Sequence, residues 1–207
     1  MTALASHFMT RSSGDHATRV RDPDLVRLAD IVFERSFGRG KITLSSGKES
    51  SFYFDMKPSM LDPEGASLIA RQILKEIRAV GGEYIGGLEM GAVPITGAVC
   101  QHSYEQSAPV HGFFVRKEAK AHGAKKRVEG LPKGRTLEGK RVVVVDDVTT
   151  SGESALKAVD ACAQEGAHVV LVISIVDREE GASETFAERN LPFKALLTAS
   201  EFLSRDA

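Results

Sequence analysis

A run of four valines, Val142 to Val145, constrains the fold of this chain more than any other feature. Consecutive β-branched residues without alternation are typical of a strand that is buried on both faces, as in a parallel sheet covered by helices on each side. Two aspartates follow directly, then a turn rich in hydroxyl groups and glycine, and then apolar residues at helical spacing. The segment 141–164 is therefore expected to form a strand, an acidic strand end and a helix N-terminus in immediate succession.

Strands and helices alternate along most of the chain, which predicts an α/β fold with a central, mostly parallel sheet flanked by helices. Two helices are expected to begin at Asp22–Pro23 and Asp62–Pro63, where an aspartate caps the helix and a proline occupies its first turn. The remaining expected elements are strands at 84–87, 110–115, 141–145, 168–176 and 193–197, and helices at 93–104, 154–164 and from Ser200. Ligands of such sheets bind at the carboxyl ends of the strands.

The segment 41–57 alternates around Ser45–Lys48, which predicts a β-hairpin in which Thr43 and Leu44 pair with Phe52–Phe54. Residues 1–21 have no unbroken apolar stretch and are expected to form a flexible arm. No later run approaches the length of a membrane span, so we expect no membrane partner.

The charge balance excludes a strong general attraction to nucleic acid. The 207 residues include 27 basic and 28 acidic side chains, for a net charge of −1, so any electrostatic function must be local. The two cysteines, Cys100 and Cys162, lie in apolar stretches without metal-ligand spacing. They are expected to be small buried thiols in a reducing cytoplasm.

The acidic strand end and the turn after it predict a site for a sugar phosphate. A phosphate in the turn Val148–Ser154 would receive bonds from N–H and hydroxyl groups and would meet the positive end of the helix dipole. Asp146 and Asp147 would point to opposite faces if the strand continued, so we expect the chain to leave β geometry there. An alternative is that Thr150 and Glu153 form a capping box, which leaves the two aspartates unexplained.

A second charged feature lies between the strands expected to end at Val115 and to begin at Arg141. The segment 116–135 holds eight basic residues and two acidic ones, a local net charge of +6. A solvated loop or a nucleic-acid patch is the alternative, but no aromatic residue interleaves the charges to stack on bases. A mobile loop of this kind fits closure over a pyrophosphate, where it would exclude water and oppose the charge on a leaving group.

The sequence of residues 142–152 resembles the signature for phosphoribosyl diphosphate (PRPP) in the type I phosphoribosyltransferases. Residues 116–123, Arg-Lys-Glu-Ala-Lys-Ala-His-Gly, are similar to the catalytic loop of the orotate phosphoribosyltransferases within that family, and 46–55 resemble the hood that covers orotate in them. The resemblance implies the type I phosphoribosyltransferase fold with a small hood. It implies one domain over 22–207, with the hood formed largely by 22–60 and the C-terminal strand region 191–207.

The resemblance also implies the reaction: transfer of the 5-phosphoribosyl group from PRPP to orotate, giving orotidine 5′-phosphate and pyrophosphate. Lys120 and Asp147 are the catalytic candidates, and Thr150, Arg178, Tyr53 and Phe54 are expected to bind orotate. The cofactor is expected to be Mg²⁺, held mainly through PRPP and by waters near the two aspartates, with no ligand set made of protein alone. Candidates for binding PRPP are Arg116, Lys117, Lys120, His122, Asp146, Asp147, Val148, Thr149, Thr150, Ser151, Gly152, Glu153 and Ser154.

In the family the basic loop reaches the neighbouring subunit, so the resemblance implies a homodimer that shares the loop Arg116–Arg135. The chain departs from many relatives at Ser45 and at Gly91, where they carry lysine, and Lys41, Lys48 or Lys57 are candidates to compensate.

A phosphoribosyltransferase for another base and a PRPP-sensing regulator without catalysis remain alternatives. Arg178, suited to grip a carboxylate with two bonds, and the hood favour orotate, and the short arm offers no DNA-binding module. A P-loop nucleotidase is excluded because no GxxxxGK[ST] motif occurs.

Overall fold

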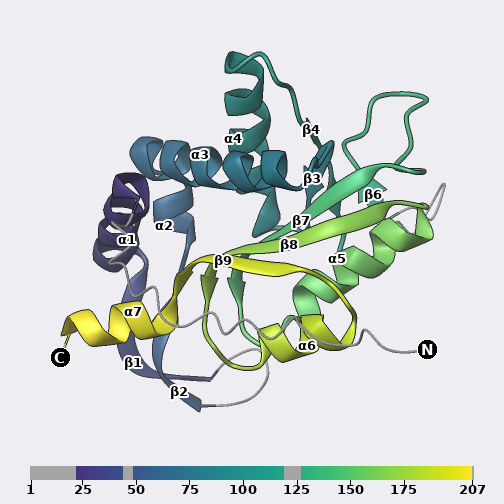
Figure 1. Cartoon of the computed structure of the whole chain (residues 1–207). Helices are drawn as coiled ribbons and strands as arrows, with labels where there is room; N and C mark the ends of the chain where they lie inside the picture. Colours follow the sequence, from purple (N-terminus) through teal and green to yellow (C-terminus); the bar gives the residue numbers. More distant parts are fainter. Residues whose placement is uncertain (1–21, 44–48, 119–126, 207) are drawn as a thin grey trace, which may run out of the picture.

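The computed structural model describes residues 22–43, 49–118 and 127–206. The expected arm at 1–21, the hairpin turn at 44–48, and the candidates Lys120 and His122 lie outside the described residues. The core of the molecule is a five-stranded parallel sheet in the order β4-β3-β7-β8-β9 (Figure 1). This confirms the parallel sheet predicted from the valine run. Its strands are β3 (Tyr84–Gly86), β4 (His111–Gly112), β7 (Arg141–Thr149), β8 (His168–Asp177) and β9 (Phe193–Thr198).

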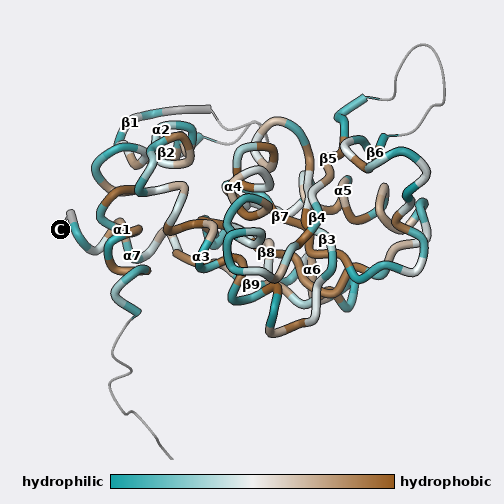
Figure 2. The backbone as a smooth tube through the Cα atoms, turned by 90° about the horizontal axis from the view of Figure 1, so that it is seen from above, coloured by the Kyte–Doolittle hydropathy of each residue, from teal (hydrophilic) through white to brown (hydrophobic). Residues whose placement is uncertain are grey.

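Helices cover both faces of this sheet, and the valines of β7 divide between the two layers. Val143 and Val145 pack in the core that includes α1 (Pro23–Arg35), α3 (Pro63–Ala79) and α4 (Ala92–Glu105). Val142 and Val144 face the core with α5 (Glu153–Gln164) and α6 (Ala182–Glu188). All four side chains are fully buried, as expected for a strand between two helical layers. Figure 2 shows apolar segments in the middle of the molecule and polar ones mainly at its edges.

The predicted helix starts are confirmed. The N–H of Asp24 donates to Asp22 Oδ1 at 3.0 Å, and the N–H of Gly65 donates to Asp62 Oδ2 at 2.8 Å, so each aspartate satisfies a backbone donor that the helix leaves free. Within the described ranges, no helix is long and apolar enough to cross a bilayer.

The N-terminal hairpin is present, but its predicted pairing is wrong. β1 (Phe37–Thr43) and β2 (Glu49–Phe54) are antiparallel, with Phe37 opposite Phe54 and Thr43 opposite Glu49. β1 begins earlier than predicted and includes Gly38 and Gly40, residues that lower strand propensity. The ring of Tyr53 lies against Gly38, where a Cβ atom would collide with it. This cross-strand contact accounts for glycine at a strand position.

The hood is completed by helices from both ends of the described chain. The short helices are α2 (Lys57–Met60) and α7 (Ala199–Leu203), followed by the 3₁₀ turn η1 (Ser204–Asp206). The ring of Phe202 lies 5.8 Å from that of Phe37 and 5.1 Å from that of Phe54, measured between centroids. β9 pairs with β8 in the main sheet, and α7 reaches the hairpin through Phe202. The expected hood boundary stays a prediction.

The predicted strand at 110–115 is divided in two. β4 joins the main sheet, whereas β5 (Phe114–Val115) pairs with β6 (Val128–Glu129) in a separate antiparallel ladder. This ladder forms the base of the basic loop. The elements α2, α6 and β6 were not predicted, because each is too short to show a clear period.

Candidate active site

The two aspartates remain within strand β7, so the expected departure from β geometry is wrong. Pairing with β8 continues from Asp146 to Thr149, which lies opposite Asp177, and these ladder bonds keep the backbone extended. Asp146 is buried and lines a pocket. The carboxylate of Asp147 lies against Gly91, in the loop after β3, where a side chain at position 91 would collide with it. A side chain at position 91 would require the carboxylate of Asp147 to move.

The buried carboxyl group of Asp146 is electrostatically unusual. Burial and the negative charge of Asp147 raise the pKa of Asp146 to about 8. Of the three lysines suggested as compensation, Lys48 lies outside the described residues. The pKa of Lys57 is raised mainly by its bond to Asp55, with a smaller contribution from the charge of Asp147.

The turn between β7 and α5 is shaped by Gly152. Its φ of 86° is in the left-handed region, and it is the N-cap residue of α5, a conformation that glycine adopts without steric cost. The ring of Phe186 packs behind it, 2.9 Å from where a Cβ atom would lie. No side chain caps α5, so the predicted capping box of Thr150 and Glu153 is wrong. Because helix α5 begins at Glu153, Thr150 lies too early in the chain for that role.

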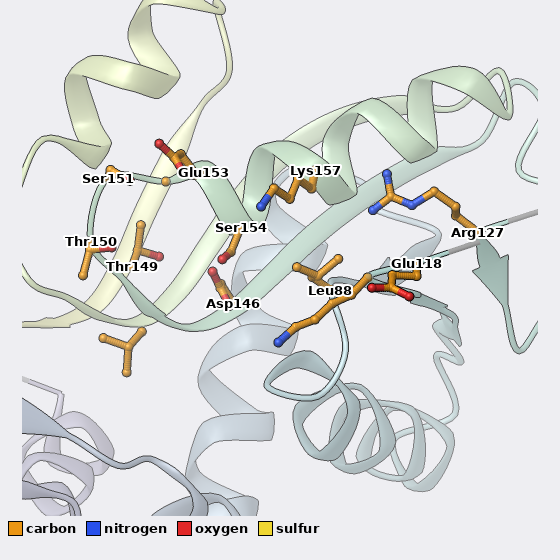
Figure 3. A pocket seen from close by; sticks show the side chains of 13 residues that line it. Leu88, Glu118, Arg127, Asp146, Thr149, Thr150, Ser151, Glu153, Ser154 and Lys157 are labelled. Atoms are coloured by element: carbon orange, nitrogen blue, oxygen red, sulfur yellow. The ribbon is translucent and has the colours of Figure 1, made fainter. Parts of the chain in front are cut away.

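A pocket of about 560 Å³ lies above this turn (Figure 3). The hydroxyl oxygen of Thr149 is buried and has no hydrogen-bond partner among the described residues, and the first N–H groups of α5 lack partners within the helix. Unused donors at a helix N-terminus suit an anion such as phosphate. The lining consists of Leu88, Lys117, Glu118, Arg127, Asp146, Val148, Thr149, Thr150, Ser151, Gly152, Glu153, Ser154 and Lys157.

The pocket unites the turn with the base of the basic loop, as the sequence predicted. Of the expected PRPP contacts with a described position, Asp147 and Arg116 do not line it. The pocket also includes four residues that were not predicted from the sequence: Leu88, Glu118, Arg127 and Lys157. A signal for Lys157 was available, because it follows Ser154 by three residues and so lies on the same face of the helix.

The base of the loop is held by several polar contacts. The guanidinium of Arg116 lies 3.4 Å from Glu129 Oε1, and the Nε of Arg127 donates to the carbonyl oxygen of Arg116 at 3.1 Å. The N–H of Lys117 donates to Glu89 Oε1 at 2.9 Å, which ties the loop to the segment after β3. In this structure Arg116 therefore joins the two arms of the loop instead of facing the pocket.

The candidate carboxylate-binding residue Arg178 is buried at the end of β8. Its Nε donates to Glu180 Oε1 at 2.8 Å, and its Nη2 donates to Ser50 Oγ at 3.0 Å. The backbone N–H of Arg178 also donates to the carbonyl oxygen of Thr149 at 2.9 Å. Arg178 thus connects the hood strand β2 to the phosphate turn.

Among the hood aromatics, Phe52 lies closest to Arg178: the guanidinium carbon is 4.3 Å from the centre of its ring. Alternation along β2 places Phe52 and Phe54 on one side and Tyr53 on the other. Phe54 packs against Phe37 and Phe202, whereas Tyr53 is 39% exposed. Their rings therefore do not form one surface, and Phe54 supports the hood from within.

This chain is similar to known proteins in both sequence and fold. The family model of the phosphoribosyl transferase domain matches residues 64–189. The orotate phosphoribosyltransferase of Rhodopseudomonas palustris (strain BisB5) is 59% identical over 179 residues, which cover 86% of this chain and 96% of that protein. The chain belongs to the orotate phosphoribosyltransferase family.

More distant members of the orotate phosphoribosyltransferase family agree. That of Aquifex aeolicus is 43% identical over 180 residues, covering 86% of this chain and 96% of that protein. The crystal structure of the Mycobacterium tuberculosis orotate phosphoribosyltransferase in complex with PRPP superposes with a TM-score of 0.71 at 33% identity, covering 87% of this chain and 99% of that one. The resemblance stated from the sequence is thereby confirmed, and so is the type I phosphoribosyltransferase fold.

Proposed function

We propose that this chain carries out the reaction of its family, transfer of the 5-phosphoribosyl group from PRPP to orotate, in the pocket between the β7–α5 turn and the base of the basic loop. The observation that carries this assignment is the pocket itself, which joins an anion-binding helix N-terminus to lysine and arginine side chains of the loop. The turn Val148–Ser154 would bind the 5′-phosphate. Asp146 and Asp147 would face the ribose hydroxyl groups.

The chemistry follows from where charge develops. Departure of pyrophosphate leaves positive charge on ribose C1 and concentrates negative charge on the leaving group, so cations that close over it lower the barrier. Lys120 is the catalytic candidate for this step, together with Asp147 beside the ribose. Lys117, His122 and Arg116 would share the pyrophosphate, and Arg116 would have to exchange its contact with Glu129 to do so.

Orotate would be oriented by Arg178 and Thr150, with its ring nitrogen directed at C1. Arg178 is linked by its backbone to Thr149, and orotate carries a carboxylate that a guanidinium binds with two parallel bonds. Arg178 would have to exchange its contacts with Glu180 and Ser50 to do so. Tyr53 would contact the base from the hood. Phe54 would act through the packing that holds β2 in place.

Mg²⁺ is the cofactor we propose. Mg²⁺ keeps several waters and binds substrate phosphates, so it needs few ligands from the protein. The buried carboxyl of Asp146, with its raised pKa, is consistent with a nearby cation in the loaded site. Mg²⁺ would supply positive charge beside the diphosphate, with Asp146 and Asp147 binding its waters.

The activity is tested by following orotate absorbance in the presence of PRPP and Mg²⁺, with uracil, adenine and hypoxanthine as control bases. We expect orotate alone to be consumed. Consumption of another base would overturn the orotate assignment and leave the fold untouched. The chain folds like the Leishmania donovani adenine phosphoribosyltransferase, with a TM-score of 0.61 at 19% identity, so fold alone does not select the base.

We further propose a homodimer in which the loop 116–135 completes the neighbouring subunit's site. Lys120→Ala and Arg178→Ala should each be nearly inactive, yet mixing and re-equilibrating them should restore part of the activity in hybrid dimers with one intact site. No recovery despite demonstrated subunit exchange would remove the shared loop. We expect the enzyme to work in the cytoplasm, where its two cysteines, both free, would stay reduced.

A further inference from the structure

Lys157, on helix α5, lines the pocket and makes no ion pair with another described residue. Lys157 extends from α5 toward Ser154 in the pocket that Arg127 also lines (Figure 3). Four of the seven other described lysines pair with carboxylates: Lys57 with Asp55, Lys75 with Asp22, Lys140 with Glu83 and Lys194 with Glu76. Lys157 takes part in no ion pair within the described ranges.

Helix stability does not explain this residue either. Glu153 and Lys157 have the i, i+4 spacing and the order that favour an ion pair on a helix, but no salt bridge joins them in the described structure. Lys157 lies in the second turn of α5, which begins at Glu153, beyond the turn where the helix dipole acts most strongly. Lys157 is exposed and lines the pocket, so its ammonium group is accessible to an anion there.

We propose that Lys157 is a phosphate-binding residue of the PRPP pocket, contributed by the same chain as the β7–α5 turn. This inference rests on the proposed function, and it adds a contact on a rigid helix to those expected from the loop. Lys157 lies one turn beyond Ser154 on the same helix face, so its ammonium group extends the row of donors that begins with the N–H groups of the turn. The loop lysines reach the substrate when the loop closes, whereas Lys157 is present in the open pocket.

The first test compares Lys157→Ala, Lys157→Arg and the wild type in steady-state kinetics and in direct PRPP binding by calorimetry. Loss of one charge-assisted bond should raise the KM and Kd for PRPP roughly tenfold, with kcat changed much less and the KM for orotate unchanged. Arginine should restore most of the affinity. Lys140→Ala, at the opposite end of β7, is the matched control and should leave both constants as they are.

The second test locates the phosphate group. Ribose 5-phosphate and pyrophosphate are used as inhibitors. In the Lys157→Ala variant, the inhibition constant of one of them should rise by the same factor as the Kd for PRPP. Unchanged inhibition by both, or unchanged PRPP affinity in a folded variant, would overturn the role of Lys157. If the wild type bound PRPP but left orotate untouched, the base assignment would fail while the calorimetric test of Lys157 would remain valid.

Discussion

The phosphate end and the base end of the site are built in different ways. The phosphate end comes mainly from one continuous segment, β7, the turn at Gly152 and the start of α5. The base end joins Arg178 at the end of β8 to Ser50 and Phe52 of a hairpin far away in the sequence. A continuous segment fixes its own geometry through backbone bonds, whereas the base end depends on how the hood packs. The KM for PRPP should therefore change mainly with mutations in the β7–α5 segment itself. The KM for orotate should also change with mutations that alter how the hood packs.

The largest effect is expected at the phosphate end, from Gly152→Ala. An alanine would be strained at a φ of 86° and would press against the ring of Phe186. Because a small displacement of binding groups can cost two orders of magnitude, kcat/KM for PRPP should fall about 100-fold. Gly139→Ala is the control, since Gly139 has a φ of 66° but open space around it and lies outside the loop 116–135. Near-normal PRPP kinetics in Gly152→Ala would show that the turn is less rigid than its geometry indicates.

The matching variant at the base end is Arg178→Lys. Lysine keeps the charge and loses the planar, two-bond grip on a carboxylate, so the KM for orotate should rise roughly 30-fold, about 2 kcal/mol, with little change in the KM for PRPP. Arg189→Lys, at an exposed ion pair with Asp160, should alter neither constant. Equal increases in both KM values would break the comparison, because the two ends would then act as one unit.

A pH effect is expected from Asp146→Asn. The pKa of Asp146 is raised to about 8 from a reference of 3.8, so the folded protein keeps a proton that the unfolded chain loses above pH 4. The wild type therefore loses stability between about pH 4 and 8, whereas asparagine has no such proton to lose. As the pH rises from 4 to 8, the free energy of unfolding of the variant should increase relative to that of the wild type by roughly 1 to 3 kcal/mol, measured by urea unfolding. A difference that stays constant with pH would contradict the raised pKa, and Asp160→Asn is the exposed control.

The smallest effects separate the two hood aromatics. Phe54→Leu should lower the free energy of unfolding by about 1 kcal/mol, because it removes ring contacts within the hood, and should change the KM for orotate only slightly. Tyr53→Leu should do the reverse, with a severalfold higher KM for orotate and little loss of stability. Both quantities come from urea unfolding and initial rates on the same preparations. An orotate defect confined to Phe54→Leu would restore Phe54 as a direct contact.

The same contrast explains what could be predicted from the sequence. The order of strand, turn and helix in the β7–α5 segment was predictable because its valine run, its turn glycine and the helical spacing after it are local signals. The extension of β7 to Thr149 was not, because it depends on pairing with β8. The pairing of β1, the place of Phe54 and the hood contacts of Arg178 were not, because they depend on packing between segments far apart in the chain. Lys157 was missed for another reason: a single lysine on a helix has many explanations until the pocket beside it is seen.

The aromatic cluster of the hood joins Phe37, near the start of the described chain, to Phe202, near its end. During synthesis on a ribosome, β7, the turn and α5 can assemble while the last residues are still unmade, but the hood cannot close. Contacts between such distant segments form late, because ordering a long loop costs entropy before the contacts offset it. The nascent chain should therefore acquire its phosphate site before its base site, and a chain that ends before α7 should bind PRPP without holding orotate.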